Sequence, residues 1–283
     1  MHPNETADGT VRRALEEERA LVATLGGFTL EIAGGRLVTN ERIPVPRFNF
    51  IQEVRVSPAR QAAFFEKALD HYFQRALRPT IRVVEPVPAA LERSLASLGF
   101  RPLADPHLLL VGKAAGGDQS ADTSGARPAH ESELEEVIGF WSSPREREEL
   151  RRAVEVAWTH PNPDEQLVPF VVDREGLAVA ALVHRYLGIW GIHSVATQPV
   201  RRGRGLATAL VQGALRTVGT PGEPIVIHSD SPRLADHLGP LGFQTGATFR
   251  VFELPSDAEL ALPRVPPDST PRWRPPRGLT KPD

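Results

Sequence analysis

A six-residue pattern occurs twice in this sequence, and its spacing constrains the fold more than any other feature. Residues 95–100 and 238–243 both read L-x-x-L-G-F and lie 143 residues apart. So short a pattern can recur by chance, but the same offset also relates longer expected elements. It pairs strand 48–56 with strand 191–199, helix 58–77 with helix 201–220, and strand 81–84 with strand 224–227. Agreement over about fifty residues favours an internal duplication.

The composition of the chain supports two folded parts. Its 283 residues are 41% hydrophobic and 24% charged, which allows two cores of ordinary domain size. Small and polar residues fill the middle of the chain, whereas prolines crowd its end. We therefore predict a domain over 1–113, a linker over 114–128, a second domain over 129–254 and a proline-rich tail over 255–283.

The C-terminal half shows strands that alternate with helices. The apolar residues of 202–218 repeat at helical spacing, which predicts a helix with one buried face. A helix over about 131–157, with its N-terminal cap near His130, is expected to precede the strands. The other expected elements are strands 168–174, 177–187, 188–197 and 224–228, a short helix over 231–243 and a strand over 247–254.

Composition also excludes several kinds of chemistry. The chain has no cysteine, so it forms no disulfide and has neither a thiol nucleophile nor a thiolate metal site. A net charge of −2 gives no general attraction to nucleic acid or to an anionic membrane, and we expect neither as a partner. No run approaches the roughly 20 apolar residues that span a bilayer, and the start lacks a signal pattern. We expect a cytoplasmic protein.

The segment 202–207, Arg-Gly-Arg-Gly-Leu-Ala, joins an expected strand directly to an expected helix. Glycines let a ligand approach the backbone, and the first amides of a helix lack intrahelical partners. The helix dipole adds partial positive charge at the same end, so the context predicts a phosphate or pyrophosphate site. Arg201, Arg202 and Arg204 can add charge-assisted contacts. An ordinary arginine-glycine turn is the alternative, and the flanking strand and helix make it less favoured.

This run resembles the signature Q/R-x-x-G-x-G/A of the GNAT superfamily of N-acetyltransferases, matched here by Arg202, Gly205 and Ala207. The resemblance implies that loop amides bind the pyrophosphate of coenzyme A and that a splayed strand contacts its pantetheine arm. Acetyl-CoA would be the co-substrate. The implied coenzyme-binding residues are Val195, Ala196, Thr197, Arg202, Gly203, Arg204, Gly205, Leu206, Ala207 and Ser231.

Together with the duplication, the resemblance implies an α/β (α+β) chain of two tandem GNAT-like domains. Each would have a mixed, mostly antiparallel sheet flanked by helices, in an arrangement similar to mycothiol synthase. The N-terminal copy is degenerate, because the 143-residue offset maps Gly203 to Arg60 and Gly205 to Ala62. Ser57 as a cap and Pro58 as a first helical residue explain that loop as an ordinary helix start. One coenzyme site per chain is therefore predicted.

Candidates for the catalytic groups are unequal. His193 lies on strand 188–197, in alternation with Val195 and Thr197, and an imidazole is suited to act as a base on the attacking amine. A half-buried histidine satisfied by the backbone is the equally favoured alternative. In the family the leaving thiolate is often protonated by a tyrosine, but that position is Leu238 here.

The remaining candidates for the proton donor are Tyr186 and water, unless no fixed acid is used. His237 is next to the position of the missing tyrosine, but points about 100° away on the helix. The histidines show no spacing with acidic residues that suggests a metal site, so we predict no metal. Ser231 is included among the coenzyme-binding residues on the basis of the resemblance alone.

The leading hypothesis is an acetyl-CoA-dependent N-acyltransferase that acetylates a primary amine of a small molecule or peptide. A protein that binds acetyl-CoA as a sensor or scaffold, without turnover, is the alternative, and the missing tyrosine favours it. An arginine-rich nucleic-acid module is disfavoured, because the net charge is close to zero and no aromatic residues accompany the arginines of the loop.

Overall fold

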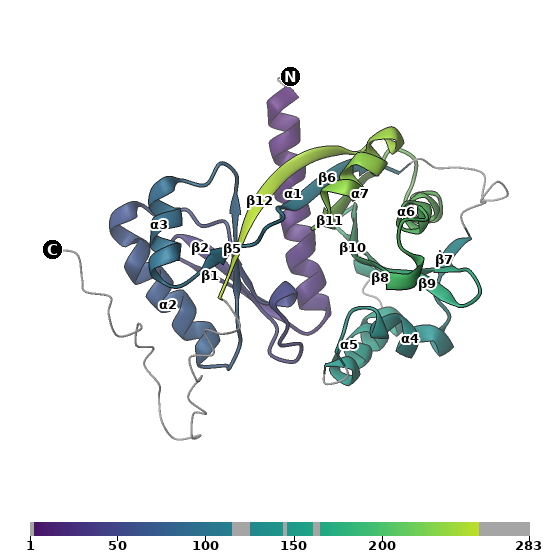
Figure 1. Cartoon of the computed structure of the whole chain (residues 1–283), viewed down its shortest axis with the longest axis horizontal. Coiled ribbons are helices and arrows are strands. Elements are labelled where there is room, and N and C mark those ends of the chain that lie inside the picture. Colours follow the sequence, from purple (N-terminus) through teal and green to yellow (C-terminus); the bar gives the residue numbers. More distant parts are fainter. Residues whose placement is uncertain (1–2, 115–124, 144–145, 161–164, 255–283) are drawn as a thin grey trace. The chain divides into compact units, whose positions relative to one another are not determined.

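A computed structural model describes residues 3–114, 125–143, 146–160 and 165–254 (Figure 1). These residues form two compact units. Unit 1 comprises the described residues up to Gly26 and those within 105–248, and unit 2 comprises 27–104 and the described residues from Phe249 onward. Most of the predicted linker and the whole predicted tail over 255–283 lie outside the described residues.

Unit 1 is built on a mixed sheet in the order β12-β6-β11-β10-β9-β8-β7. The parallel pair is β10 with β11, and the other registers given for this unit are antiparallel. Its strands are β6 (His107–Lys113), β7 (Ala126–Pro128), β8 (Glu165–Asp173), β9 (Leu177–Tyr186), β10 (Ile189–Thr197), β11 (Pro224–Ser229) and the first half of β12 (Gln244–Glu253). Its helices are α1 (Pro3–Thr24), α4 (Leu134–Gly139), α5 (Arg147–Thr159), α6 (Leu206–Thr217) and α7 (Pro232–Leu238).

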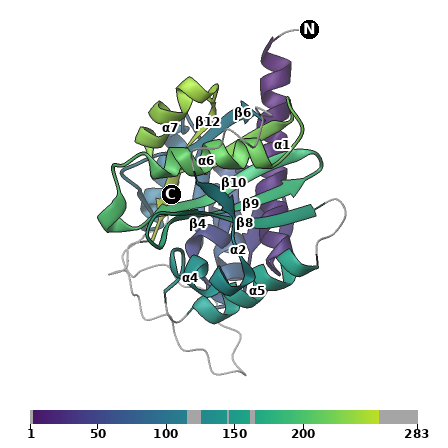
Figure 2. The ribbon, with the colours of Figure 1, turned by 90° about the vertical axis from the view of Figure 1, so that its right-hand side faces the viewer.

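Helices cover both faces of the unit 1 sheet (Figure 2). Helix α6 packs its apolar face, including Leu210 and Val211, on Trp190 and Ile192 of β10, and α7 lies on the same side. Helices α4 and α5 cover β8 and β9 from the other side, where Val137 packs near Ala180. Helix α1 also packs on β9 and β10. The side chains of β10 therefore alternate between these two helical layers.

Unit 2 has a smaller sheet with two helices packed on it. Its strands are β1 (Phe28–Ile32), β2 (Gly35–Thr39), β3 (Phe50–Gln52), β4 (Thr80–Val84), β5 (Arg101–Pro102) and the second half of β12, and its helices are α2 (Gln61–Phe73) and α3 (Ala89–Ser97). Here β3 and β4 form the parallel pair. Phe64, Phe65 and Leu69 of α2 share one core with Leu91 and Leu95 of α3.

The order of elements agrees with the predicted duplication. In each half, three strands are followed by a helix, a strand, a second helix and a strand. Helix α2 and strand β4 of the first half thus correspond to α6 and β11 of the second. The parallel pair occupies the same place in both halves.

The compact units differ from the predicted domains because the last strands of the two halves are exchanged. Strand β6 follows the first copy in the chain but pairs with β11 of unit 1 from Leu108 to Lys113. The end of β12 follows the second copy but pairs with β4 of unit 2 through Phe249–Phe252. Helix α1 also belongs to unit 1. The predicted boundary at 113 therefore does not separate the two units.

The helix predicted over 131–157 is interrupted. A 3-10 turn over Glu131–Glu133 leads into α4, which ends at Gly139, and α5 begins only at Arg147. Glycine favours a helix end, and Pro144 in the intervening sequence lacks the backbone donor that a continuous helix needs.

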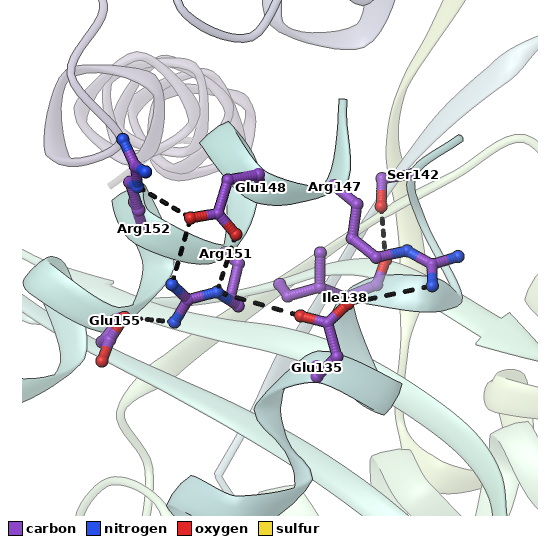
Figure 3. A network of polar contacts seen from close by, with 8 residues as sticks. All are labelled: Glu135, Ile138, Ser142, Arg147, Glu148, Arg151, Arg152 and Glu155. Carbon is purple, nitrogen blue, oxygen red and sulfur yellow. Dashed lines mark hydrogen bonds and ion pairs between the residues drawn. The ribbon is translucent and has the colours of Figure 1, made fainter. Parts of the chain in front are cut away.

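Polar contacts join the two resulting helices (Figure 3). The Glu135 carboxylate on α4 lies 3.8 Å from both Arg147 and Arg151 on α5. Glu148 also pairs with Arg151 and Arg152 along α5 itself. Solvent screens these exposed pairs, so each contributes little to the free energy of folding.

Helix α1 is the largest element that the sequence analysis does not predict. Charged residues occupy buried positions on it, among them Glu17, Glu18 and Arg19. These residues interrupt the apolar periodicity by which a buried helix face is recognised. The helix predicted over 231–243 is also shorter, because α7 gives way to a 3-10 turn at Gly239.

Candidate functional site

The site begins where β10 separates from β11. Their parallel pairing covers Trp190, Gly191 and Ile192, which lie opposite Ile225–Ile227. Strand β10 then continues to Thr197, so residues 193–197 extend past the last pair with β11. A strand edge that leaves its neighbour can offer backbone groups to an extended ligand. This is the splayed strand that the GNAT resemblance implies.

A bulge lies at the same point of β10. The pairing with β9 shifts register between His193 and Ala196, and Ser194 adopts a positive φ of 55°. The bulge changes the expected alternation of side chains, because Val195 packs on the core under α6 whereas His193 contacts α1. The regular alternation expected from His193 to Val195 and Thr197 is therefore interrupted at Ser194. Bulges commonly redirect side chains beside active sites.

The predicted phosphate loop follows directly. Gly203 and Gly205 have φ values of +76° and +72°, and a Cβ atom added to either would meet no other atom within 4 Å. Both glycines are therefore required by the left-handed backbone rather than by close packing. The loop is exposed, and β10 leads into it through a 3-10 turn over Pro199–Arg201.

Helix α6 begins at this loop with its amides available. Its first intrahelical bond runs from the amide of Ala209 to the carbonyl of Gly205, at 2.9 Å. The amides of residues 206–208 precede that bond and lack intrahelical acceptors. No acidic residue stands in the first turn, so the partial positive charge of the helix end is not neutralised there. The arrangement is suited to bind a phosphate group.

The other predicted coenzyme ligands are placed unevenly around this loop. Arg204 is exposed, whereas Arg201 donates to the carbonyl of Glu175 at 2.9 Å and Arg202 to that of Thr197 at 3.3 Å. Leu206 packs partly on the core, so only its backbone faces the loop end. Ser231 caps α7 by accepting a bond from the amide of residue 234. Its predicted role beside the coenzyme stays a prediction.

His193 is the first residue of β10 beyond the pairing with β11, and it is 5% exposed. Its Nε2 lies 2.9 and 3.0 Å from the two carboxylate oxygens of Glu17 on α1. The same carboxylate accepts from Nδ1 of His184 on β9, at 2.8 Å. Neither histidine is satisfied by a backbone carbonyl in these contacts. His193 therefore belongs to a buried histidine-carboxylate pair.

Glu17 stays ionised in this setting. Burial alone would raise the pKa of its carboxyl, but the charge and hydrogen bonds of His193 and His184 outweigh burial and lower that pKa to about 2. An ionised carboxylate accepts only, so the Nε2 of His193 carries a proton directed at Glu17. When the ring is in its neutral form, Nδ1 carries its lone pair. The carboxylate thus fixes both the tautomer and the orientation of the imidazole.

Gly191 makes room for this pair. It is opposite His184 in the β9–β10 register and two residues before His193 on the same face. A Cβ atom at this position would overlap the Glu17 carboxylate and the Nε2 atom of His193. No sequence signal identified Glu17, because it lies 176 residues from His193 on a helix that was not predicted.

Further histidines adjoin the pair. The ring of His228 on β11 stacks on that of His193, with centroids 4.9 Å apart and planes within 15°. His107 on β6 places its Nε2 3.2 Å from the Nδ1 of His228. Burial lowers the pKa of His228 to about 3, so this ring is neutral.

Tyr186, predicted as one candidate proton donor, lies away from this site. It pairs with Ile189 at the hairpin end of β9, whereas His193 pairs with Leu182. Four residues along a strand amount to about 13 Å. His237 is exposed on α7, and Leu238 is fully buried in the core. None of the three is placed to protonate a thiolate beside His193.

The corresponding loop of unit 2 lacks the features of a phosphate site. Ser57 has a φ of −62°, and no described residue over 57–62 has a positive φ. Phe64, which occupies the position of Ala207, is buried in the unit 2 core. Its ring also lies 2.8 Å from the place where a Cβ atom at Gly35 would stand.

Within the described residues, no helix is long and apolar enough to cross a membrane. Glu17, His193 and His228 form one group of side chains that could hold a metal ion, and Glu18, His107 and His228 form another. Neither group is visible as a spacing in the sequence, because in each group the glutamate lies more than 80 positions from either histidine.

Comparison with solved structures shows which fold this is. A GCN5-related N-acetyltransferase from Kribbella flavida aligns with a TM-score of 0.56 and 17% identity, over 86% of this chain and 96% of that one. One from Sphaerobacter thermophilus aligns with a TM-score of 0.53 and 14% identity, over 78% and 76%. A conserved protein of unknown function from Staphylococcus epidermidis aligns with 0.60 and 9% identity, over 81% and 95%.

No protein-family model matches the sequence, and no curated protein matches it. The structural likenesses nevertheless show that the chain has the GNAT fold, which confirms the predicted fold class. The finer likeness to mycothiol synthase stays a prediction.

Proposed function

We propose that this protein is an acetyl-CoA-dependent N-acyltransferase whose single coenzyme site lies in unit 1. The observation that carries the proposal is the join between β10 and α6. A splayed strand, a loop with two left-handed glycines and a helix end without acidic residues follow one another within about fifteen residues. In the GNAT fold, such a join is suited to bind an extended pantetheine arm and a pyrophosphate.

In the proposed complex, the amides at the start of α6 bind the pyrophosphate, and the arginines of the loop add charge at its rim. The exposed edge of β10 over 195–197 binds the pantetheine arm through backbone hydrogen bonds. The thioester then lies near the point where β10 and β11 separate. His193 is the residue at that point.

The reaction transfers an acetyl group to a primary amine. The amine nitrogen attacks the thioester carbonyl, a C–N bond forms, and the C–S bond breaks as the coenzyme leaves as a thiolate that takes up a proton. His193 accepts the proton of the amine at Nδ1, directly or through water, while Glu17 holds its Nε2–H. The acceptor belongs to the class of small-molecule or peptide amines.

One observation favours a second candidate, a protein that binds acetyl-CoA without turnover. The position that carries a tyrosine in many GNAT enzymes is the fully buried Leu238, and Tyr186 does not reach the site. The thiolate would then have to be protonated by water.

A thiol-release assay separates the two candidates. The full chain is incubated with acetyl-CoA and a panel of primary amines, and free coenzyme A is measured with a thiol reagent. An acyltransferase releases coenzyme above the rate of hydrolysis with at least one class of amine. Binding of coenzyme A with no release for any amine would support the sensor instead, and failure to bind coenzyme A would contradict both.

A further inference from the structure

Three buried side chains meet beside the proposed catalytic pair. They come from three separate elements of unit 1: Glu18 from α1, His107 from the start of β6 and His228 from β11. The Nδ1 of His228 lies 3.2 Å from the Nε2 of His107 and 3.6 Å from the Oε1 of Glu18. The exposed fractions of the three side chains are 5%, 11% and 8%, in the order His228, His107 and Glu18.

These separations suit a shared metal ion. Zinc binds histidine nitrogen and carboxylate oxygen at about 2.0–2.2 Å, so two ligand atoms of a tetrahedral site are about 3.4 Å apart. The distances of 3.2 and 3.6 Å lie on either side of that value. One oxygen and two imidazole nitrogens also form a common ligand set of divalent transition metals.

The hydrogen bonding of His107 also favours a metal site. The Nδ1 of His107 is bonded to the carboxylate of Asp230, which leaves its Nε2 directed at His228. A carboxylate on the far nitrogen of a histidine is the usual partner of a metal-ligating imidazole, because it fixes the tautomer and raises the basicity of the ligand.

Hydrogen bonding alone accounts for this cluster poorly. One proton can lie between the Nε2 of His107 and the Nδ1 of His228, and Glu18 at 3.6 Å is beyond hydrogen-bond distance of that same Nδ1. A divalent ion between the three atoms would account for their mutual approach, because it attracts all of them at once.

We propose that Glu18, His107 and His228 bind one divalent transition-metal ion of the zinc type, with Asp230 supporting His107. Three protein ligands leave a fourth position of a tetrahedral ion for water. The ion would tie α1 to β6 and β11 of the same unit. No metal is predicted from the sequence, and a metal ion at this site does not depend on the proposed acyltransferase function.

The test uses the full chain without an affinity tag, stripped of metal with a chelator and then dialysed. Zinc is titrated in competition with a chromophoric chelator, and Co²⁺ is added separately so that its visible ligand-field bands report the coordination. We expect one equivalent to bind, with bands typical of a tetrahedral nitrogen and oxygen site. The melting temperature should also rise with free zinc concentration.

Variants locate the ion. His107→Ala and the isosteric Glu18→Gln should each abolish the cobalt bands, and Asp230→Asn should weaken zinc binding roughly 10- to 100-fold. His237→Ala removes an exposed histidine of the same unit and should change nothing. Circular dichroism shows whether each variant is folded. If His107→Ala does not fold, the conservative Glu18→Gln and Asp230→Asn changes still test the site.

Two results would overturn the proposal. The first is that the wild-type protein binds zinc and cobalt no more tightly than exposed histidines do, as measured by competition with the chelator. The second is metal binding that survives Glu18→Gln and His107→Ala but is lost in His193→Ala. That outcome would assign the ion to the alternative group of Glu17, His193 and His228.

Discussion

At the scale of single residues, the proposed catalytic chemistry depends on a pair that spans most of the chain. His193 was predicted from its place on the strand before the phosphate loop, and that place is confirmed. Its partner Glu17 was not predicted, because a charged residue on an unrecognised helix carries no local signal of burial. Tyr186 was predicted only because the chain has two tyrosines, and the register of β9 places it too far from His193.

The pair leads to a kinetic prediction. His193→Ala should lower the turnover number roughly 10²- to 10⁴-fold, because the variant lacks the base that deprotonates the amine. The affinity for coenzyme A should change little, since the coenzyme is bound by the loop and the strand edge. Steady-state kinetics and a separate binding titration measure the two quantities.

Glu17→Gln should lower turnover as well, by less, while coenzyme affinity again stays constant. The amide keeps the shape of the side chain but does not hold the imidazole as a carboxylate does. The matched control is His237→Ala, whose exposed ring lies off the site and should leave turnover near that of the wild type. Normal turnover in His193→Ala would contradict the assignment of the base.

A second residue-scale prediction concerns the cap of the 3-10 turn before α4. The Glu133 carboxylate accepts two bonds from Arg127, at 2.6 and 2.8 Å, and one from the amide of His130, at 2.7 Å. The hydrogen bonds from Arg127 lower the pKa of Glu133 to about 2, although partial burial opposes the shift.

Because the pKa of Glu133 is lower in the folded protein than in the unfolded chain, the ionised carboxylate stabilises the folded protein above pH 4.5. This stability is lost as the pH falls from 4.5 toward 2. Glu133→Gln should cost about 1 kcal/mol near neutral pH and should flatten that part of the pH dependence. Urea unfolding at several pH values measures both. If the free energy of unfolding of the variant falls with pH below 4.5 as steeply as that of the wild type, Glu133 is not the group responsible.

At the scale of elements, the periodicity of the C-terminal half predicted most of the secondary structure. Strands 177–187 and 188–197 correspond closely to β9 and β10, and the helix over 202–218 to α6. The failures have local causes. The helix predicted over 131–157 is interrupted because α4 ends at Gly139, and the bulge at Ser194 arises from tertiary pairing that no periodicity encodes.

The loop before α6 allows a prediction about coenzyme binding. Gly205→Val should nearly abolish coenzyme binding, because a β-branched side chain strains the left-handed backbone and occupies the open space beside the helix end. Gly222 provides a matched control, since its φ is +88° and its Cβ position is also open, but it lies in the turn before β11.

Gly205→Val and Gly222→Val should therefore lose similar amounts of stability, about 1–2 kcal/mol each. Only the first should lose coenzyme binding. Thermal unfolding and calorimetric titration of both variants make the comparison. Equal coenzyme affinity in the two variants would place the phosphate site elsewhere.

At the scale of the whole molecule, the sequence predicted a duplicated GNAT fold but not how the copies divide into compact units. Internal similarity identifies which elements correspond, and it contains no information on which strand completes which sheet. The exchange of β6 and the end of β12 is a matter of long-range pairing. For the same reason, the cluster of Glu18, His107 and His228 could not be found before the fold was known.

The two copies also differ in function under this account. The loop at 202–207 keeps the left-handed glycines, whereas the loop at 57–62 has no positive φ and leads into the buried Phe64. Changing Ala62 to valine should therefore leave coenzyme binding intact. Only unit 1 should bind the coenzyme.

The most direct measurement is a calorimetric titration of coenzyme A into the full chain, with Ala62→Val titrated in parallel. One coenzyme should bind per chain, with the same affinity in the wild type and in Ala62→Val. Two coenzymes per chain, a loss of affinity in Ala62→Val, or no binding would contradict the central claim that the loop between β10 and α6 is the one coenzyme site.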